Sequence, residues 1–194
     1  MLDPLPPLPD RVSRIAMIAR WKPVHLGHAA VLEALADRAD HAIVGIGSPN
    51  KYDASNPFTA DETASMIRLV LDGRDNVELV EVPDLGHGPR WRAMVVGMFG
   101  TLDLFATANG YVRSLLEHEY RVVHPVWLIA PERRVAVNGT MVRRLMARSE
   151  QWRDLVPPVI AGYLDANGLV ERFRSEFGDE TRALEDAEKK SEPT

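Results

Sequence analysis

Short apolar runs alternate with longer segments of helical periodicity along most of this chain. The runs are almost unbroken and rich in β-branched residues, which is typical of strands that are covered on both faces. They predict five strands, at 15–19, 42–46, 77–82, 102–106 and 121–123. Two further runs, VWLI at 126–129 and RVAV at 134–137, predict an additional edge pair.

The segments between these strands carry helix signals. Apolar residues share one face of a segment that begins near Leu26. Thr59 and Glu62 have the spacing of a capping box, Asn138 is a good N-cap residue, and Pro158 suits a first helical position. The predicted helices begin near 26 and otherwise span 59–71, 89–99, 139–147 and 158–166, the last stopped by an Asn-Gly pair.

This alternation predicts an α/β fold, a Rossmann-like doubly wound parallel sheet with helices on both faces and a C-terminal helical segment. In such sheets ligands bind beyond the carboxyl ends of the strands. A length of 194 residues suits one domain, which we place at 14–177. It is flanked by a proline-rich N-terminal tail at 1–13 and a charged C-terminal tail at 178–194, either solvated chain or an exposed terminal helix.

Composition excludes several classes of function. The formal net charge of −5 argues against a nucleic-acid partner, because such proteins neutralise phosphates with a basic surface. The absence of cysteine excludes disulfides, thiolate metal sites and cysteine nucleophiles. The first 13 residues lack the apolar centre of a signal peptide, and no apolar run is long enough for a membrane span. We therefore expect a cytoplasmic protein with no membrane partner.

The stretch RWKPVHLGH at 20–28 lies where a predicted strand gives way to a helix. His25 and His28 flank Gly27 and, being three residues apart, share one helix face. A helix N-terminus attracts anions, a glycine lets an anion approach the backbone, and Arg20 adds a guanidinium from the strand end. The assembly predicts a polyphosphate site.

Two alternatives compete with this interpretation. One histidine could simply cap the helix while the other is exposed to solvent. The pair could also hold a metal, but no third ligand is suggested, so no metal bound by protein side chains is predicted. A related question concerns GIGSPN at 45–50, where Gly45 and Gly47 invite a dinucleotide-fingerprint interpretation. The third glycine is missing and no helix follows at once, so we favour a tight turn near the adenosine.

Several motifs in chain order make this sequence similar to one superfamily. ARWKPVHLGH resembles the H-x-G-H signature of the nucleotidyltransferases, and more narrowly that of the archaeal-type nicotinamide mononucleotide adenylyltransferases. GIGSPN, NPFTADE, VPDLGHGPRW and TANGYV match successive segments of that family. VNGTMVRR resembles its second phosphate motif and places Arg143 on the arginine of that motif, while QWRDLVPPVIAGYLDANGLVERF resembles its C-terminal helices. The similarity runs from about residue 15 to 173.

The resemblance implies an enzyme that transfers AMP from ATP to nicotinamide mononucleotide, forming NAD and pyrophosphate by direct in-line attack. Such a reaction requires positioning and charge stabilisation rather than a protein nucleophile. The resemblance also implies Mg²⁺ that accompanies ATP, a homo-oligomer, and catalytic roles for Arg20, His25, His28 and Arg143. The implied ATP-binding residues are Arg20, Trp21, Lys22, Pro23, Gly27, His28, Asn109, Asn138, Gly139, Thr140 and Arg143.

The resemblance further implies a site for the acceptor, in which Trp91 stacks on the nicotinamide ring and Asp84 lies beside its amide. The implied acceptor-binding residues are Gly47, Ser48, Phe58, Asp84 and Trp91. Without the resemblance, Trp91 is equally well interpreted as a core residue of an amphipathic helix, and Arg143 is better interpreted as part of a solvated basic face.

Some positions depart from the family pattern. Thr63 occupies a position where the family usually has an arginine, and Gly88 one where it frequently has an asparagine. Asn138 replaces the common serine, and Lys22 replaces the usual glutamine. Lys22 and Lys51 could replace the lost positive charge, as point charges rather than as a bidentate fork. The departures leave the acceptor open. Three alternatives therefore stay open: a nucleotidyltransferase with another acceptor or another nucleotide such as CTP, a non-catalytic nucleotide-binding regulator, and a structural domain with a fortuitous motif.

Overall fold

The computed structural model describes residues 8–191, and its centre is a five-stranded parallel sheet. The strand order is β3-β2-β1-β4-β5, so the chain crosses to the other side of β1 after β3. All neighbouring strands in this sheet are parallel. The strands are β1 (Val12–Ala19), β2 (Ala39–Gly47), β3 (Val77–Val82), β4 (Leu104–Ala106) and β5 (Val122–Val123). The predicted fold class and all five predicted strands are confirmed.

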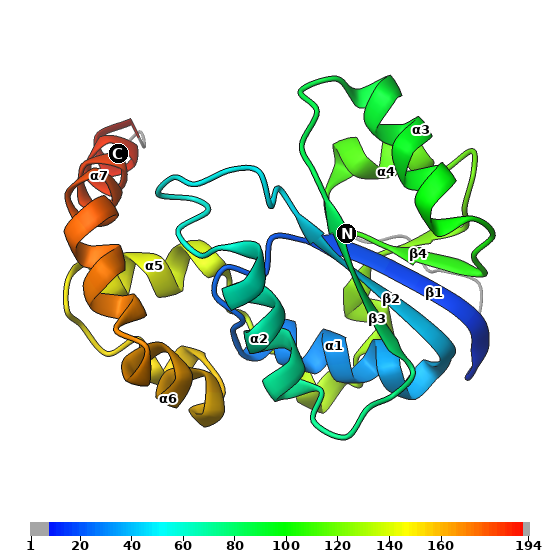
Figure 1. The fold of residues 1–194 in the computed structure, drawn as a ribbon, viewed down its shortest axis with the longest axis horizontal. Helices are drawn as coiled ribbons and strands as arrows, with labels where there is room; N and C mark the ends of the chain where they lie inside the picture. Colours follow the sequence, from blue (N-terminus) through cyan, green and yellow to red (C-terminus); the bar gives the residue numbers. More distant parts are fainter. Residues whose placement is uncertain (1–7, 192–194) are drawn as a thin grey trace.

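Helices cover both faces of the sheet, as Figure 1 shows. One face carries α1 (Leu26–Arg38) and α2 (Ala60–Val70), and the other carries α3 (Gly88–Phe99) and α4 (Gly110–Leu116). Three α-helices and three 3-10 turns complete the described part of the chain: η1 (Pro125–Leu128), η2 (Pro131–Arg133), α5 (Gly139–Ala147), η3 (Arg153–Leu155), α6 (Pro158–Ala166) and α7 (Leu169–Ser191).

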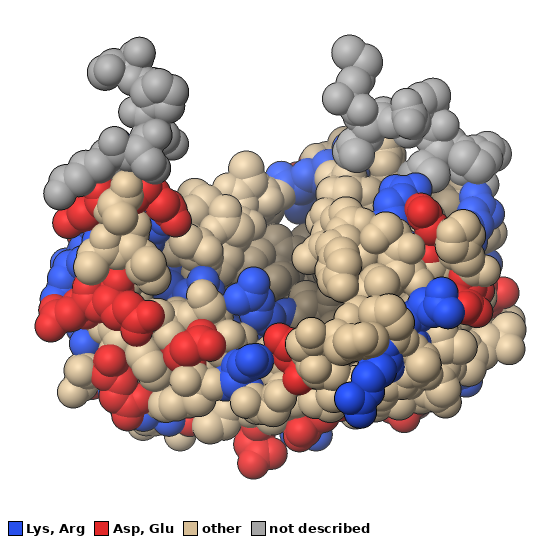
Figure 2. Space-filling model, turned by 90° about the horizontal axis from the view of Figure 1, so that it is seen from above, with Lys and Arg blue, Asp and Glu red and all other residues tan. Residues whose placement is uncertain are grey.

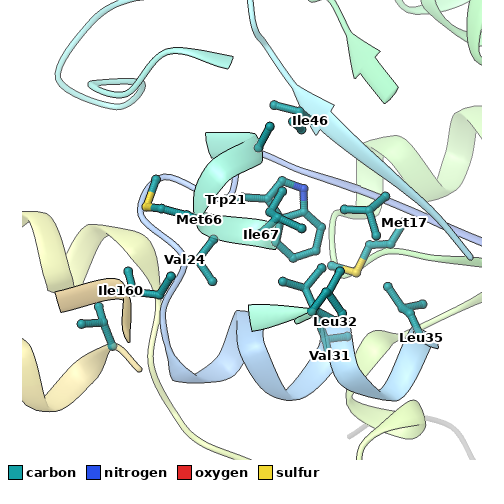
Figure 3. Packing of buried hydrophobic residues seen from close by; sticks show 14 of the residues in the cluster. Met17, Trp21, Val24, Val31, Leu32, Leu35, Ile46, Met66, Ile67 and Ile160 are labelled. Atoms are coloured by element: carbon teal, nitrogen blue, oxygen red, sulfur yellow. The ribbon is translucent and has the colours of Figure 1, made fainter. Parts of the chain in front are cut away.

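Each face of the sheet has its own apolar core. On the α1 and α2 side, the fully buried Trp21 lies near Ile46 and Ile67 (Figure 3). Its indole N–H donates to the carbonyl oxygen of Gly45 at 2.8 Å, which joins the end of β1 to β2. On the other side a smaller cluster gathers around Phe99 of α3. Burial from both sides explains why the central strands β1 and β2 contain continuous apolar runs, whereas the edge strand β3 keeps the exposed Glu78 and Glu81.

Capping residues set the helix ends where the sequence predicts them. The amide of Glu62 donates to the hydroxyl of Thr59 at 3.2 Å, and the amide of Thr59 donates back to the Glu62 carboxylate at 2.9 Å. This is the predicted capping box. Asn138 accepts a hydrogen bond from the amide of Met141 at 3.0 Å and starts α5 at the predicted position. Asn167 caps the end of α6.

The predicted edge pair is wrong, and one helix was missed. Residues 126–129 belong mostly to the 3-10 turn η1, and 134–137 have no regular structure. Pro125 explains the first error, because proline suits the first position of a helical turn and cannot donate to a strand ladder. The segment expected as a turn around Asn109 contains the seven-residue helix α4, which is too short to show a clear periodicity.

The charged C-terminal segment is part of one continuous helix, α7, with no break at 177–178. Its C-terminal half packs against α5. The guanidinium of Arg148 donates to the Glu185 carboxylate at 2.9 Å, and Arg182 donates to the carbonyl oxygen of Ala147 at 2.5 Å. This half of α7 is therefore a helix that packs against α5 and not solvated chain.

The structure describes only the last part of the predicted N-terminal tail. Residues 1–7 lie outside the described residues, and Val12 already belongs to β1. Within residues 8–191, no helix combines the length and the apolar character that crossing a membrane requires.

Candidate active site

A cavity of about 930 Å³ lies beyond the carboxyl ends of β1, β2, β3 and β4, where the predicted fold would bind a ligand. Arg20, Ser48, Asp84 and Asn109 line it from the loops that follow these strands. On the remaining side, Leu184 contributes from α7. Figure 2 shows the hollow in the middle of this face, between the part that carries α7 and the part that carries α3 and α4. The cavity is large enough for a nucleotide and a second small molecule.

Helix α1 begins at the edge of this cavity with the two predicted imidazoles. His25 is the N-cap, and its Nδ1 accepts the amide hydrogen of His28 at 3.2 Å. The two rings stack with centroids 3.6 Å apart, and the His28 ring also contacts Trp21 at 4.8 Å. A Cβ on Gly27 would lie 3.2 Å from the His25 ring and 3.3 Å from the carbonyl oxygen of Val137. The glycine thus permits this close arrangement, and His28 lines the cavity instead of facing bulk solvent.

Hydrogen bonds assign different tautomers to the two rings. Nδ1 of His28 lies 3.3 Å from the carbonyl oxygen of Pro23, which can only accept, so this nitrogen carries the proton. Nδ1 of His25 is itself an acceptor, so the proton of His25 is on Nε2. Burial and the nearby Arg143 lower the pKa of His25 to about 4, and burial and His25 lower the pKa of His28 well below 6.5. Both rings are therefore neutral near pH 7.

Acidification is expected to destabilise the protein through these two histidines. Between pH 6.5 and about 4, His25 of the unfolded chain binds a proton that the folded protein excludes, so stability falls as the pH falls. His25 alone would cost on the order of 3 kcal/mol across this window. Urea unfolding at a series of pH values measures the slope. Replacing His25 with asparagine should flatten it, whereas replacing the exposed His118 should not.

The N-terminus of α5 lies against the start of α1. Asn138 caps α5, and a Cβ on the next residue, Gly139, would lie 3.2 Å from the carbonyl oxygen of Lys22. Arg143 donates from Nη1 to this same carbonyl oxygen at 2.8 Å and from Nη2 to the hydroxyl of Thr140 at 3.3 Å. The two predicted phosphate motifs are therefore joined by a direct hydrogen bond, and two positive helix ends lie together.

The cationic groups around this junction differ in their surroundings. Burial and repulsion by Arg20 lower the pKa of Arg143 to about 10, so Arg143 stays charged near pH 7. Arg20 is exposed and lines the cavity. Arg143 interacts electrostatically with both His25 and His28, although it does not itself line the cavity. The structure thus brings the four residues expected to be catalytic close together, with Arg20 and His28 in the lining of the cavity and His25 and Arg143 outside it.

Two oppositely charged side chains lie near this end of the cavity: Asp53 lines it, and Lys22 is buried behind its wall. Lys22 is 1% exposed, and its ammonium donates to the carbonyl oxygen of Ser48 at 3.3 Å. Burial lowers the pKa of Lys22, while the attraction of Asp53 opposes this shift. One oxygen of Asp53 accepts hydrogen bonds at 2.8–2.9 Å from the amide of Ser55 and from the amide and side chain of Asn56. Lys22 therefore acts through its charge and its backbone rather than by direct exposure to a ligand.

The residues available to a metal ion are few. Among residues 8–191 no three histidine or acidic side chains come together as a metal site. Asp53 lines the cavity, and the three hydrogen bonds that its side chain accepts from residues 8–191 all go to Oδ1, so that its second carboxylate oxygen has no donor among these residues. Magnesium commonly uses one or two carboxylates together with substrate phosphates. The donor set therefore fits a metal that enters with a nucleotide.

Trp91 and Asp84 line the opposite end of the cavity. Trp91 is half-buried against the core beneath α3 and α4, so it is at once a packing residue and part of the cavity wall. The Asp84 carboxylate accepts the amide hydrogen of Gly86 at 2.9 Å, and its other oxygen lies 4.0 Å from the ammonium of Lys51. An aromatic face and a carboxylate are thus offered to a ligand at this end.

The strand ends between these two regions are tightly packed. A Cβ on Gly47 would lie 3.2 Å from the carbonyl oxygen of Ala19, which explains the glycine. Ser48, which directly follows β2, and Trp21, two residues after the end of β1, adopt left-handed backbone angles with φ of 55° and 58°. Such angles are costly for non-glycine residues and are often found at functional sites.

Two residues that we expected to contact a ligand with their side chains are fully buried, so this expectation is corrected. Phe58 is 0% exposed and packs in the core, so it supports the loop instead of lining the acceptor end. Trp21 is also 0% exposed, so only its backbone can face a nucleotide. Asn109 does line the cavity, and its Oδ1 accepts the amide hydrogens of Tyr111 and Val112 at 2.9 and 3.2 Å. Only the Asn109 amide nitrogen is left for a ligand.

The position of the usual family arginine is also buried here. Thr63 is 0% exposed, and its hydroxyl donates to the carbonyl oxygen of Thr59 at 2.7 Å. Arg172 of α7 approaches the same turn, where it donates to the Glu62 carboxylate at 2.6 and 2.7 Å and to the carbonyl oxygen of Pro57 at 3.2 Å. Thr63 therefore contributes nothing to the cavity, and Arg172 holds the turn from outside.

Sequence reasoning missed several residues that line the cavity, among them Asp53, Glu180 and Leu184. Asp53 could have been found, because the D-x-S-N spacing is typical of an aspartate that caps its own turn. Glu180 and Leu184 lie on α7 and reach the cavity only through the packing of α7 against α5, for which the sequence offers no local signal.

Comparisons with known proteins agree with this arrangement. Residues 17–145 match the cytidylyltransferase-like family. The chain is 32% identical to the nicotinamide-nucleotide adenylyltransferase of Thermococcus kodakarensis over 170 residues, which cover 84% of this chain and 88% of that protein. It is 30% identical to the enzyme of the same name from Methanolobus tindarius over 168 residues, which cover 84% of this chain and 94% of that protein. The predicted resemblance is confirmed.

Solved structures show the same fold at low sequence identity. A bifunctional NMN adenylyltransferase/ADP ribose pyrophosphatase from Francisella tularensis matches with a TM-score of 0.67 and 16% identity, over 94% of this chain and 57% of that chain. A Plasmodium falciparum nicotinic acid mononucleotide adenylyltransferase matches with a TM-score of 0.55 and 8% identity, over 82% of this chain and 98% of that chain.

Proposed function

We propose that this chain, which belongs to the cytidylyltransferase-like family of nucleotidyltransferases, transfers AMP from ATP to nicotinamide mononucleotide and forms NAD and pyrophosphate. The relatives that it matches over most of its length are nicotinamide-nucleotide adenylyltransferases. One observation carries the proposal: a single cavity has the H-x-G-H imidazole of His28 at one end and Trp91 with Asp84 at the other.

The reaction needs two substrates in line. A phosphate oxygen of the mononucleotide attacks the α-phosphorus of ATP, the bond to the β-phosphate oxygen breaks, and pyrophosphate leaves. The protein contributes by holding the two substrates and by stabilising negative charge on the phosphoryl oxygens. No side chain needs to become covalently attached to a substrate in such a reaction.

The phosphate end of the cavity supplies the charge stabilisation. We assign contacts with the triphosphate to Arg20, His25, His28 and Arg143. His25 can donate from Nε2 while neutral. His28 already donates from Nδ1 to Pro23, so its Nε2 can donate to a phosphate oxygen only after binding a proton. The negative charge of the nucleotide favours that protonation by raising the pKa of His28.

Magnesium would enter as the complex with ATP, and Asp53 is the side chain that we assign to orient it. A bound Mg²⁺ would neutralise charge on the departing pyrophosphate. The Francisella tularensis protein has also been solved in a complex with AMP and a manganese ion. Magnesium as the preferred metal, a homo-oligomeric state and a cytoplasmic location stay predictions from the family resemblance.

The acceptor would occupy the other end of the cavity. We assign stacking on the pyridine ring to Trp91 and a hydrogen bond from the carboxamide to Asp84, whose carboxylate can only accept. The backbone of Gly47 and Ser48 lies between the two ends and would approach the mononucleotide phosphate or ribose.

Incubation of the purified protein with ATP, Mg²⁺ and nicotinamide mononucleotide should produce NAD and pyrophosphate in equal amounts. Parallel reactions with nicotinic acid mononucleotide, or with CTP in place of ATP, distinguish the alternative acceptor and nucleotide. Chromatography of the products and a coupled pyrophosphate assay measure both. A folded protein that binds ATP but releases no pyrophosphate with any of these acceptors would instead support the non-catalytic regulator.

A further inference from the structure

A second pocket of about 330 Å³ adjoins the acceptor end of the main cavity. Asp84, Gly86, His87, Gly88 and Trp91 line it from the β3–α3 segment, and Tyr111, Val112 and Leu115 line it from α4. We call it the side pocket. Asp84, Trp91 and Val112 also line the main cavity, so the two hollows are continuous.

Tyr111 takes up the space above the first turn of α3. A Cβ on Gly88 would lie 2.1 Å from the hydroxyl oxygen of Tyr111, 3.1 Å from its ring carbon Cζ and 3.2 Å from a methyl carbon of Leu115. A separation below 3.0 Å is not found between real atoms of this kind. Position 88 can therefore carry no side chain while the Tyr111 ring stays where it is.

Tyr111 is held by its backbone but not by its hydroxyl. Its amide donates to Oδ1 of Asn109 at 2.9 Å, which fixes the start of α4 at the cavity wall. The side chain is 62% exposed, and its hydroxyl makes no hydrogen bond to any residue that the structure describes. A large exposed aromatic group with an unused hydroxyl, next to a half-buried tryptophan, is typical of a binding surface.

Two polar groups of the side pocket, those of Asp84 and Tyr111, complement a carboxamide, while His87, which also lines it, uses its Nδ1 to accept the amide hydrogen of Arg90 at 3.3 Å. The Asp84 carboxylate accepts hydrogen bonds, and the Tyr111 hydroxyl can donate one. A carboxamide has an NH₂ for the first and a carbonyl oxygen for the second. A carboxylate at the same place would face the charge of Asp84 at close range, which is unfavourable.

We propose that Tyr111 is a specificity-determining residue for the acceptor, closing the side pocket beyond Trp91 and donating its hydroxyl to the carboxamide of the pyridine ring. This inference rests on the proposed function. It adds that the Tyr111 side chain occupies the space that a side chain at position 88 would otherwise fill. Asp84 and Tyr111 together would favour nicotinamide mononucleotide over the nicotinic acid form.

Steady-state kinetics of three variants test this role. Tyr111→Phe should raise KM for nicotinamide mononucleotide by about 3-fold to 10-fold, since it removes one hydrogen bond. Tyr111→Ala should raise it by roughly 10-fold to 100-fold, since it also removes the aromatic wall. Neither should change KM for ATP more than about 2-fold, because Tyr111 does not line the main cavity, in which the triphosphate would lie. Arg113→Ala, on the same helix but outside both hollows, serves as the matched control.

Gly88→Ala separates a role in binding from a role in packing. The new methyl group must displace the Tyr111 ring, so it should also raise KM for the mononucleotide. In the Tyr111→Ala background the same substitution meets no hydroxyl, and its effect should largely disappear. Additive effects of the two substitutions would contradict the proposal.

The outcome also separates this inference from the proposed function. A wild type that forms NAD, together with a Tyr111→Ala variant whose KM for the mononucleotide is unchanged, would overturn the role of Tyr111 alone. A wild type that forms no NAD would overturn both.

Discussion

Replacing His28 with alanine is expected to lower kcat by roughly 100-fold to 1000-fold, with a smaller effect on KM for ATP. The His28 ring lines the phosphate end of the cavity, and its Nδ1 is fixed by the carbonyl oxygen of Pro23. The ring is therefore already oriented before a nucleotide binds. Its contact should strengthen as charge develops on the phosphoryl oxygens, and a contact of this kind affects turnover more than binding.

Structural damage must be separated from this loss of turnover. The His28 ring stacks on His25 and contacts Trp21, so its removal should also cost about 1–3 kcal/mol of stability. His28→Asn keeps more of the packing and should show a similar loss of kcat in a better-folded protein. Alanine at the exposed His118 is the control for a histidine outside the site. A His28→Asn variant with wild-type turnover would remove His28 from the mechanism.

Protonation on binding gives a second readout for His28. ATP binding near pH 7 should be accompanied by proton uptake, because Nε2 of the resting ring carries no proton. Calorimetric titrations in two buffers of different ionisation enthalpy detect it. The uptake should disappear in His28→Asn, and its persistence there would assign the proton to another group.

The sequence predicted those parts of the fold that depend on neighbouring residues. The capping box of Thr59 and Glu62 and the N-cap Asn138 set helix starts through contacts within one turn, which a linear pattern contains. The strands were found because burial on both faces leaves a continuous apolar run. The convergence of His25, His28 and Arg143 was predicted from the family resemblance, and the hydrogen bond from Arg143 to Lys22 now gives its geometry.

The rest depends on contacts between distant segments. No local pattern indicates that Leu184 lines the cavity, because this follows from the packing of α7 against α5. The same holds for Tyr111 over Gly88, which meet only when α3 and α4 pack together. Phe58 was misjudged because an aromatic residue in a loop motif has the same sequence pattern whether it contacts a ligand or fills the core.

Replacing Arg143 with alanine is expected to lower kcat/KM for ATP by about 100-fold to 1000-fold. Arg143 stays cationic near pH 7, and its guanidinium joins the N-terminus of α5 to the carbonyl oxygen of Lys22 beside the two imidazoles. The substitution removes a charge that we assign to the triphosphate and also leaves the Lys22 carbonyl oxygen without the Arg143 donor, at a cost of about 1–3 kcal/mol in stability. Initial rates over a range of ATP concentrations, with denaturation curves for each variant, measure the two effects separately.

Two further variants test whether the effect depends on the planar guanidinium group rather than on positive charge alone, and on position 143 rather than on its neighbour. Arg143→Lys keeps the charge but loses the planar fork, so it should recover only part of the activity. Arg144→Ala is the matched control, because the adjacent Arg144 pairs with Glu188 of α7, away from the cavity. It should stay within about 3-fold of the wild type, as a surface ion pair contributes little. Equal losses from Arg143→Ala and Arg144→Ala would indicate that α5 acts through its general basic charge, and the specific contact assigned to Arg143 would then be wrong.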